Sequence, residues 1–369
     1  MDIKYKYSNL ASFASKDDNF LGRKYPYTPS KYRGEFQRDR DRVIHSNSFR
    51  RLKFKTQVFV YHEGDHFRTR LTHSLEVSQI ARSVARVLKL NEDLCEVLSL
   101  AHDLGHTPFG HAGETALSNC LNNDIFDHNV QSLRILILLE DTYNNQKGLN
   151  LSINCIDGLL KHNGPLSNID ILNNQLPEIF DYKINLKSSG SLEAQISSLA
   201  DDIAYNCHDI DDGLRAGLFN IGDLFELKFL KNIFKNENKI TNSEIVRKLL
   251  NILVTDLIEK SQDKIKREQI KSVEDVYNKN FNIINFSNDV IIGLNEIRNF
   301  LETKMYNHNS IKKWNINSEN IIKQLFAYFK KNNKKIPNFN PNFSEDRNIA
   351  DYISGMTDKF ALNIYKSIK

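Results

Sequence analysis

Helical periodicity is the feature of this sequence that most constrains its fold. Apolar residues recur at helical spacing in several long runs, while glycine and proline number only 15 and 7 among 369 residues. Because these two residues interrupt helices, their scarcity lets a helix continue for many turns. Strand signals are few, and the best of them spans residues 57–61. The sequence therefore predicts an all-α protein.

The strongest helical patterns cover residues 72–90, 91–104, 128–140, 191–214 and 240–260. Thr72 is expected to cap the first of these helices, and Gly105 and Pro108 are expected to end the second. The last one opens with a capping box formed by Thr241 and Glu244. No internal repeat and no long linker divides the chain. We therefore expect one helical domain with a C-terminal helical extension.

Charge and cysteine content exclude several classes of protein. The 50 basic and 46 acidic side chains leave a formal net charge of +4, a weak overall field that does not indicate a nucleic-acid binder. No C-x-x-C pair occurs among the widely spaced cysteines, so neither a disulfide framework nor a zinc ribbon is expected. The N-terminus lacks the apolar run of a signal peptide, and no stretch approaches the ~20 apolar residues that span a bilayer. The sequence predicts a cytoplasmic protein without a membrane partner.

Histidine and aspartate residues on apolar helices indicate a metal site. His73 precedes Val77 by one turn on an apolar stripe, a position where a lone histidine is usually a hydrogen-bonded core residue. The pair His102–Asp103, however, ends a helix built from leucine, valine and alanine. Burying an imidazole and a carboxylate together is costly unless a cation compensates them. The pair therefore favours a metal ligand role for His73 as well.

A fourth ligand is expected from the pair Asp201–Asp202. An isolated acidic pair is usually solvated, but here Asp201 shares a helical face with other polar side chains: Ser198, Tyr205 and His208. Two imidazoles and two carboxylates suit a divalent ion with open positions for water and phosphate. The cofactor is thus expected to be Mn²⁺, Mg²⁺ or Fe²⁺, and the proposed ligands are His73, His102, Asp103 and Asp201.

The ordered set H…HD…D formed by these ligands resembles the HD superfamily of metal phosphohydrolases. Longer strings are more specific: RTRLTHSLEV, AHDLGHTPFGHAGE, FDHNVQSLRIL, GLLKHNGP and ADDIAYNCHDIDD. Together with FQRDRDRVIHSNSFRRLKFKTQVF and DYISGMTDKFA, they resemble the bacterial deoxyguanosinetriphosphate triphosphohydrolase-like family. The match runs from about Tyr32 to Asp212 and resumes near Asp351, and the segment between is poorly matched. The resemblance also selects Asp201 over Asp202, because the family's ligand directly follows an alanine.

The resemblance implies an HD-domain helical core with an N-terminal arm and a C-terminal helical extension. Residues 1–68 are interpreted as the arm and a substrate-pocket segment. Residues 69–212 are interpreted as the HD metal-dependent phosphohydrolase core. Residues 213–369 are expected to form a C-terminal helical region that completes the same domain. Family members assemble as oligomers, so the resemblance also implies a homo-oligomer.

Further ionisable groups follow the proposed ligands. His111 and Glu114 are three residues apart, close enough on a helical turn for the carboxylate to orient the imidazole, and His128 opens another helix. In the family the matching positions of His111 and His128 transfer protons with Glu114 as their acidic partner. The position that matches His106 lies against phosphate.

Substrate contacts are expected mainly from the resemblance. Arg70 lies three residues before a proposed ligand and carries the positive charge that a triphosphate requires. The family places Gln57 at the sugar, with Tyr205 and Asp209 on its other side. A tyrosine beneath the deoxyribose would exclude a 2′-hydroxyl. The DYISGMTDKFA segment is expected to add to the base pocket.

These inferences lead to one functional hypothesis and two alternatives. The chain is expected to hydrolyse deoxynucleoside triphosphates (dGTP or other dNTPs) to deoxynucleoside and inorganic triphosphate, with His111 protonating the leaving 5′-oxygen. No Walker loop indicates cleavage between the β and γ phosphates. One alternative is another HD-type nucleotide phosphohydrolase. The other is a nucleotide-sensing or nucleic-acid-binding protein with a vestigial site, for which the arginine-rich segment 33–51 leaves single-stranded nucleic acid open as a partner. Activation by a second deoxynucleoside triphosphate is also left open.

Overall fold

The computed structural model describes residues 9–58, 67–121, 124–144, 146–166, 169–235 and 240–368. In these ranges the chain is helical, and strand pairing is limited to two isolated bridges, Arg23–Ser152 and Thr56–Thr69. The all-α prediction is therefore confirmed. Of the expected strand at 57–61, residues 59–61 lie outside the described residues, and 57 and 58 form no strand.

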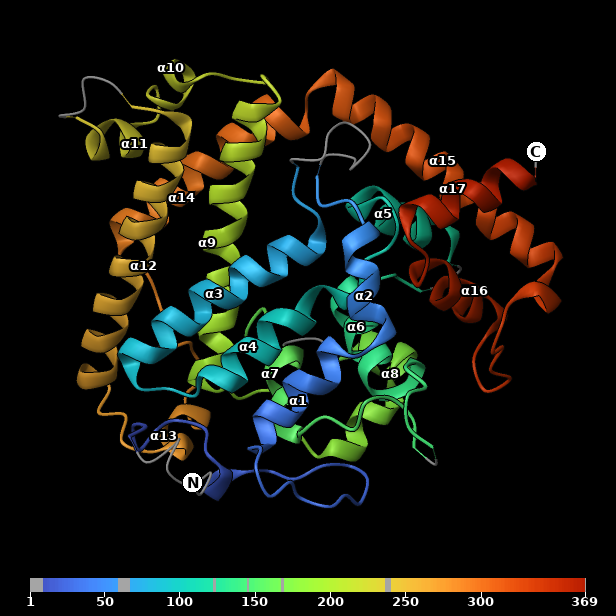
Figure 1. Ribbon diagram of the computed structural model, residues 1–369, viewed down its shortest axis with the longest axis horizontal. Coiled ribbons are helices and arrows are strands. Elements are labelled where there is room, and N and C mark those ends of the chain that lie inside the picture. The colour runs from blue at the N-terminus through green and yellow to red at the C-terminus, as the bar shows by residue number, and fades with distance from the viewer. Residues whose placement is uncertain are drawn as a thin grey trace.

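The first half of the chain forms the helices α1 to α8 (Figure 1). They are α1 (Glu35–Ile44), α2 (Asn47–Arg51), α3 (Arg70–Leu88), α4 (Glu92–Ala101), α5 (Gly110–Cys120), α6 (His128–Arg134), α7 (Ile153–Leu160) and α8 (Asp170–Gln175). Short 3₁₀ turns cover Asp17–Asn19, Leu52–Phe54, His102–Gly105 and Pro177–Tyr182, and a π-helical turn covers Ile135–Leu139.

The second half begins with a long helix, α9, and ends with three helices packed at one end of the molecule (Figure 1). Its elements are α9 (Leu192–Arg215), α10 (Ile221–Leu224), α11 (Lys228–Ile233), α12 (Asn242–Arg267), α13 (Val273–Tyr277), α14 (Asn288–Leu301), α15 (Asn309–Lys331), α16 (Glu345–Ser354) and α17 (Asp358–Ser367). A π-helical turn covers Glu302–Tyr306, and a 3₁₀ turn covers Asn333–Lys335.

Helix α3 begins earlier than its apolar pattern predicts. Its N-cap is Thr69, whose side chain accepts a hydrogen bond from the Thr72 backbone N–H. The Thr72 hydroxyl in turn accepts one from the Thr69 backbone N–H. The expected cap at Thr72 was therefore wrong, because Leu71 in the first turn packs against a different apolar cluster from Val77 and does not extend that stripe. The capping box of Thr241 and Glu244 at the start of α12 is confirmed.

Three apolar clusters hold the helices together. The largest joins α3, α9, α12 and α14, with α9 running through the middle of the molecule and α3 crossing it (Figure 1). A second lies around α1, α4, α6 and α7. The third joins α5 to α15, α16 and α17. The proposed ligands come from α3, α9 and the end of α4, so they lie where the first two clusters adjoin.

The turn after α4 requires a glycine. A Cβ on Gly105 would lie 2.1 Å from the backbone oxygen of His128 and 2.3 Å from the backbone nitrogen of Ser132. The Ser132 hydroxyl also accepts a hydrogen bond from the Gly105 nitrogen and donates one to the His102 carbonyl. The start of α6 is therefore fixed directly against the His102–Gly105 turn, which brings His128 close to the proposed ligands.

Two buried side chains join the C-terminal helices to the segment between α4 and α5. Asp358, which is fully buried, accepts hydrogen bonds from the backbone and hydroxyl of Thr56 and from the backbone of Phe109. Lys55 donates to the carbonyls of His106 and Ser354. Helices α16 and α17 thus position the segment that carries His106 and leads into α5.

The division of the chain at residues 68 and 212 remains a prediction. Among the described residues, no helix is both long and apolar enough to cross a membrane.

Replacing Asp358 with alanine should destabilise the fold by about 2–4 kcal/mol, because two buried backbone N–H groups would lose their acceptor. Urea denaturation of the purified chain would measure this change. The control is Asp141→Ala at an exposed position, where a change within about 0.5 kcal/mol is expected. Equal effects of the two substitutions would contradict the joining role of Asp358.

Candidate active site

The structure brings the four proposed ligand residues together. His73 comes from the first turns of α3, His102 and Asp103 from the turn that follows α4, and Asp201 from the middle of α9. Asp201 Oδ1 lies 2.8 Å from His73 Nε2 and 3.5 Å from His102 Nε2. His102 Nε2 lies 3.4 Å from Asp103 Oδ1. Ligand atoms of His73, His102 and Asp103 also lie within 4.8 Å of one another.

The hydrogen bonds of His102 fix its protonation. Its Nδ1 lies 2.7 Å from the carbonyl oxygen of Ser99, which can only accept, so Nδ1 carries the proton. In the neutral ring Nε2 then carries a lone pair, and it is buried without a hydrogen-bond partner in the described ranges. This lone pair faces the carboxylates of Asp103 and Asp201. A cation between these groups would remove the repulsion, so the residues present fit a bound metal ion.

His73 is oriented in the same sense by a chain of polar groups. His208 Nε2 lies 2.9 Å from the carboxylate of Glu76 and therefore donates its proton there. His208 Nδ1 lies 3.3 Å from His73 Nδ1 and holds the ring in place. His73 Nε2 faces Asp201 Oδ1 at 2.8 Å, and because a carboxylate oxygen can only accept, Nε2 donates to it while no cation is bound. Metal-binding histidines usually have their other ring nitrogen held by a neighbouring polar group in this way.

The pKa values of His102, Asp103 and Asp201 reflect the same arrangement. Burial opposes a charged His102, but the carboxylates of Asp103 and Asp201 outweigh burial and raise the pKa of His102 to about 9. Burial would raise the pKa of both carboxyl groups. The surrounding cationic groups reverse that effect and hold the pKa of Asp103 and of Asp201 well below the usual range. Without a metal, a proton on His102 takes the place of a cation.

His162 is a member of this group that sequence reasoning did not assign. Its Nε2 lies 3.4 Å from Asp201 Oδ2, and its ring stacks on His102 with the centroids 5.3 Å apart. The residue follows α7 in the GLLKHNGP string, which carried the family resemblance without a role for its histidine. That string was the signal that could have identified it.

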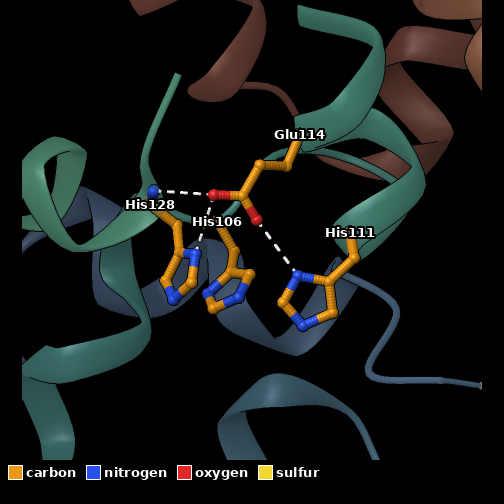
Figure 2. Close-up of side chains that lie close together, drawn as sticks. All are labelled: His106, His111, Glu114 and His128. Atoms are coloured by element: carbon orange, nitrogen blue, oxygen red, sulfur yellow. Dashed lines mark hydrogen bonds and ion pairs between the residues drawn. The ribbon is translucent and has the colours of Figure 1, made fainter. Parts of the chain in front are cut away.

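A second group of ionisable side chains lies beside the first (Figure 2). Glu114 accepts from His111 Nδ1 at 3.0 Å through one carboxylate oxygen, and from His128 Nδ1 at 2.8 Å through the other. The His128 backbone N–H also donates to Glu114, at 2.9 Å. The ring of His106 stacks on His128 with the centroids 3.9 Å apart. The expected contact between Glu114 and both histidines is present.

Asp103 connects the two groups. Its Oδ1 atom lies 3.0 Å from His106 Nδ1, while its Oδ2 atom accepts from the buried guanidinium of Arg70 at 3.0 Å. Burial and the nearby charges of Arg70 and His128 lower the pKa of His106 well below its usual value, so its ring is neutral. Arg70 is therefore paired with a proposed ligand as well as facing the cavity described next.

A cavity of about 290 Å³ opens next to His111. Gln57, Arg70 and Tyr205, three of the expected substrate contacts, line it with residues from the C-terminal half: Tyr306, Ile311 and Trp314. Gln57 Oε1 and Trp314 Nε1 are buried without a hydrogen-bond partner in the part of the chain that is described. An unpaired acceptor and an unpaired donor in one cavity wall are groups that a polar ligand can satisfy.

Asp209 lies behind this wall and does not line the cavity. It is buried and accepts a hydrogen bond from the hydroxyl of Tyr306, whose ring stacks on Tyr205 with the centroids 6.2 Å apart. Burial raises the pKa of Asp209 to about 7. Tyr306 lies outside the matched segments, so neither pattern nor resemblance indicated that it would hold Asp209 and Tyr205.

The structure also bears on two further expectations, the base-pocket role of residues 351–361 and nucleic-acid binding by the arginines of segment 33–51. The 351–361 segment lines a separate cavity of about 610 Å³, and it contacts the wall of the smaller cavity through the bonds of Asp358 and through apolar packing on Phe109. The arginines of segment 33–51 all contact partners within the chain: Arg33 with Asp41, Arg38 with Glu35, Arg40 with Glu96, Arg42 with Leu149, Arg50 with Asn47 and Arg51 with Ser48.

Comparisons with known proteins agree with this architecture. The family profile of the HD domain matches residues 70–206, and that of the phosphohydrolase-associated domain matches residues 284–367. A deoxyguanosinetriphosphate triphosphohydrolase-like protein of Pelagibacter ubique is 51% identical over 374 residues, which cover 98% of this chain and 99% of the relative. The chain belongs to the deoxyguanosinetriphosphate triphosphohydrolase-like family.

Other relatives extend the same result. Proteins of the same description from Rickettsia felis and Rickettsia bellii are each 43% identical, and the matches cover 97% of this chain and 98% of each relative. A solved structure of a hypothetical protein from Aquifex aeolicus aligns with 81% of this chain and 79% of its own at 16% identity and a TM-score of 0.32, a likeness too low to support any argument. Family membership supports a phosphohydrolase.

Replacing Asp209 with asparagine should stabilise the protein increasingly as the pH rises. The unfolded carboxyl group ionises near its ordinary pKa of 3.8 and the folded one near 7, so wild-type stability falls as the pH rises through this interval. At about 1.4 kcal/mol per pKa unit, the gain should be roughly 1–2 kcal/mol at pH 5 and a few kcal/mol at pH 8. Urea midpoints at both pH values would measure it, and a gain independent of pH would refute the assignment.

Proposed function

We propose that this chain hydrolyses deoxynucleoside triphosphates to deoxynucleoside and inorganic triphosphate. The observation that carries the proposal is the convergence of His73, His102, Asp103 and Asp201 beside two histidines held by one glutamate. The names of the relatives, which refer to deoxyguanosine triphosphate, support the same substrate class.

The four converging residues would hold a divalent cation. Such a cation, when bound, supplies charge neutralisation for a phosphate and a water molecule of lowered pKa. The protein supplies the remaining conditions. Glu76 and His208 hold the ring of His73, and the Ser99 carbonyl holds that of His102, so both Nε2 atoms keep their direction. Arg70 would add positive charge near the phosphates, because it lines the cavity and contacts Asp103.

Proton transfer to the leaving 5′-oxygen is assigned to His111. Its imidazole is the most accessible of the second group, with 69% of the side chain exposed, and it lines the cavity. Because Glu114 accepts from Nδ1, the Nε2 atom is free to exchange a proton with the substrate. His128 shares the same carboxylate. Burial opposes a charged His128, but Glu114 outweighs burial and raises the pKa of this ring. His128 is thus protonated more easily than a free histidine and would supply a proton to Glu114 and His111.

Selection of the sugar is assigned to Tyr205. The ring lines the cavity and is backed by Tyr306, which in turn bonds to Asp209, so its position is restricted from behind. A restricted ring beneath the sugar would exclude a 2′-hydroxyl. Gln57 on the opposite segment would satisfy its unpaired oxygen with the sugar or the base.

The two alternatives make different products. Another HD-type nucleotide phosphohydrolase would release a single phosphate. A nucleotide-sensing or nucleic-acid-binding protein would release none, and it is disfavoured because an idle site has no physical need of four converging polar ligands. Metal identity, the homo-oligomer and activation by a second deoxynucleotide remain predictions. A panel of four dNTPs and GTP, singly and mixed, with Mn²⁺ or Mg²⁺, would separate the proposed function from the two alternatives. The products would be resolved by ion-exchange chromatography.

Replacing Asp201 with alanine should lower triphosphate release at least about 100-fold in excess Mn²⁺, because a direct ligand is worth more than an outer partner. The neighbouring Asp202 is the matched control. It is partly exposed and paired with Arg298, so Asp202→Ala should change turnover only a few-fold. Near-normal turnover of Asp201→Ala would remove this residue from the site.

Replacing Tyr205 with alanine should reduce discrimination between dGTP and GTP about tenfold or more, because space for the 2′-hydroxyl would open. The ratio of kcat/KM for the two nucleotides measures it. Tyr306→Phe, which keeps the ring and loses the bond to Asp209, should retain most of the discrimination. An unchanged ratio in Tyr205→Ala would assign sugar selection elsewhere.

A further inference from the structure

The second histidine group also has the composition of a metal site. His106, His111, Glu114 and His128 each offer one ligand atom, and these atoms all lie within 4.8 Å of one another. They come from the loop before α5, from α5 itself and from the first residue of α6. The group contains none of the four ligands assigned above to the catalytic cation.

The side chains of this group are held in place before any ion binds. Glu114 contacts two imidazoles at once and the backbone of His128 as a third partner. His106 is buried and stacked on His128, and its Nδ1 lies against Asp103. Figure 2 shows the three rings side by side below Glu114, with Nδ1 of His111 and of His128 turned toward its carboxylate. An ion bound by the four residues would replace the hydrogens of these two bonds, so it would meet donors that are already close together.

The donor set differs in kind from that of the first site. Three imidazoles and one carboxylate form a nitrogen-rich set, which favours zinc and its neighbours over Mn²⁺ or Mg²⁺. Two imidazoles and two carboxylates, as in the first site, favour the lighter and harder ions more strongly. Four donors also match the coordination number that zinc usually adopts in proteins.

We propose that His106, His111, Glu114 and His128 form a second metal site that binds Zn²⁺, and that its occupation stops hydrolysis. A His111 ring that binds a metal ion through either nitrogen cannot take up a second proton, so it cannot form the imidazolium that protonates the leaving oxygen. The inhibitory part rests on the proposed function, because it assigns proton transfer to His111. The binding part stands on the geometry of the four residues alone.

Access and folding allow a direct test. His111 is largely exposed and borders the cavity, so an ion can reach it from solvent, and its replacement removes no core contact. His111→Ala is therefore expected to fold. His45 is an exposed histidine outside both groups and serves as the matched control.

Zinc stoichiometry tests the binding part. Metal-free protein would be titrated with Zn²⁺ against a chromogenic chelator. Wild type and His45→Ala should bind two equivalents per chain, and His111→Ala and Asp201→Ala one tight equivalent each. Loss of His111 should weaken the second equivalent at least about tenfold, the scale seen for loss of even an outer-shell partner. Identical titrations of wild type and His111→Ala would overturn the proposal.

Inhibition tests the second part in protein loaded with excess Mn²⁺. Added Zn²⁺ should stop triphosphate release, and raising the Mn²⁺ concentration tenfold should leave the inhibition unchanged. His45→Ala should behave as wild type, while Glu114→Gln should need about tenfold more Zn²⁺ for half inhibition of its residual activity. Relief by Mn²⁺ would overturn the inhibitory role by locating Zn²⁺ at the first site. Absence of triphosphate release before Zn²⁺ is added would count against the proposed function alone, since the stoichiometry is read without turnover.

Discussion

Two imidazole Nε2 atoms that face buried carboxylates at the junction of α3, α4 and α9 are the constraint on which the structure depends. His73 and His102 both direct Nε2 toward Asp201 while their Nδ1 atoms are engaged elsewhere. The carboxylates of Asp103 and Asp201 require positive charge beside them, which a proton on His102 or a cation can supply. Apolar clusters on both sides keep the three helices together around this charge. The stability of the core thus maintains an arrangement suited to a cation.

Asp103 makes one unit of two apparently separate groups. One of its oxygens faces His102 and His106, and the other is neutralised by Arg70. A change of charge in either group is therefore transmitted to the other through a single buried carboxylate. Gly105, two residues later, brings the start of α6 close enough for His128 to join. The short sequence between α4 and α5 consequently determines the geometry of nearly the whole site.

Local periodicity predicted the helices, and it can be read from one segment at a time. The order of polar residues, together with the family resemblance, predicted which side chains would meet. The cap of α3 was misplaced because Leu71 in its first turn packs against a different apolar cluster from Val77 and does not extend that stripe. His162, Tyr306 and Trp314 were not assigned, since their roles depend on partners more than 30 residues away in the chain. Such pairings arise from tertiary packing and leave no local pattern.

Through the hydrogen bonds of Lys55 and Asp358, the C-terminal helices influence the position of the His106 loop, although they contribute none of the proposed ligands. Both residues hold the loop on which His106 and Phe109 lie, and neither lines the cavity beside His111. In a genetic screen, substitutions near the α16–α17 turn would therefore give the same loss of activity as substitutions of the histidines. Proximity to the reacting atoms would be a poor guide to which substitutions inactivate this enzyme.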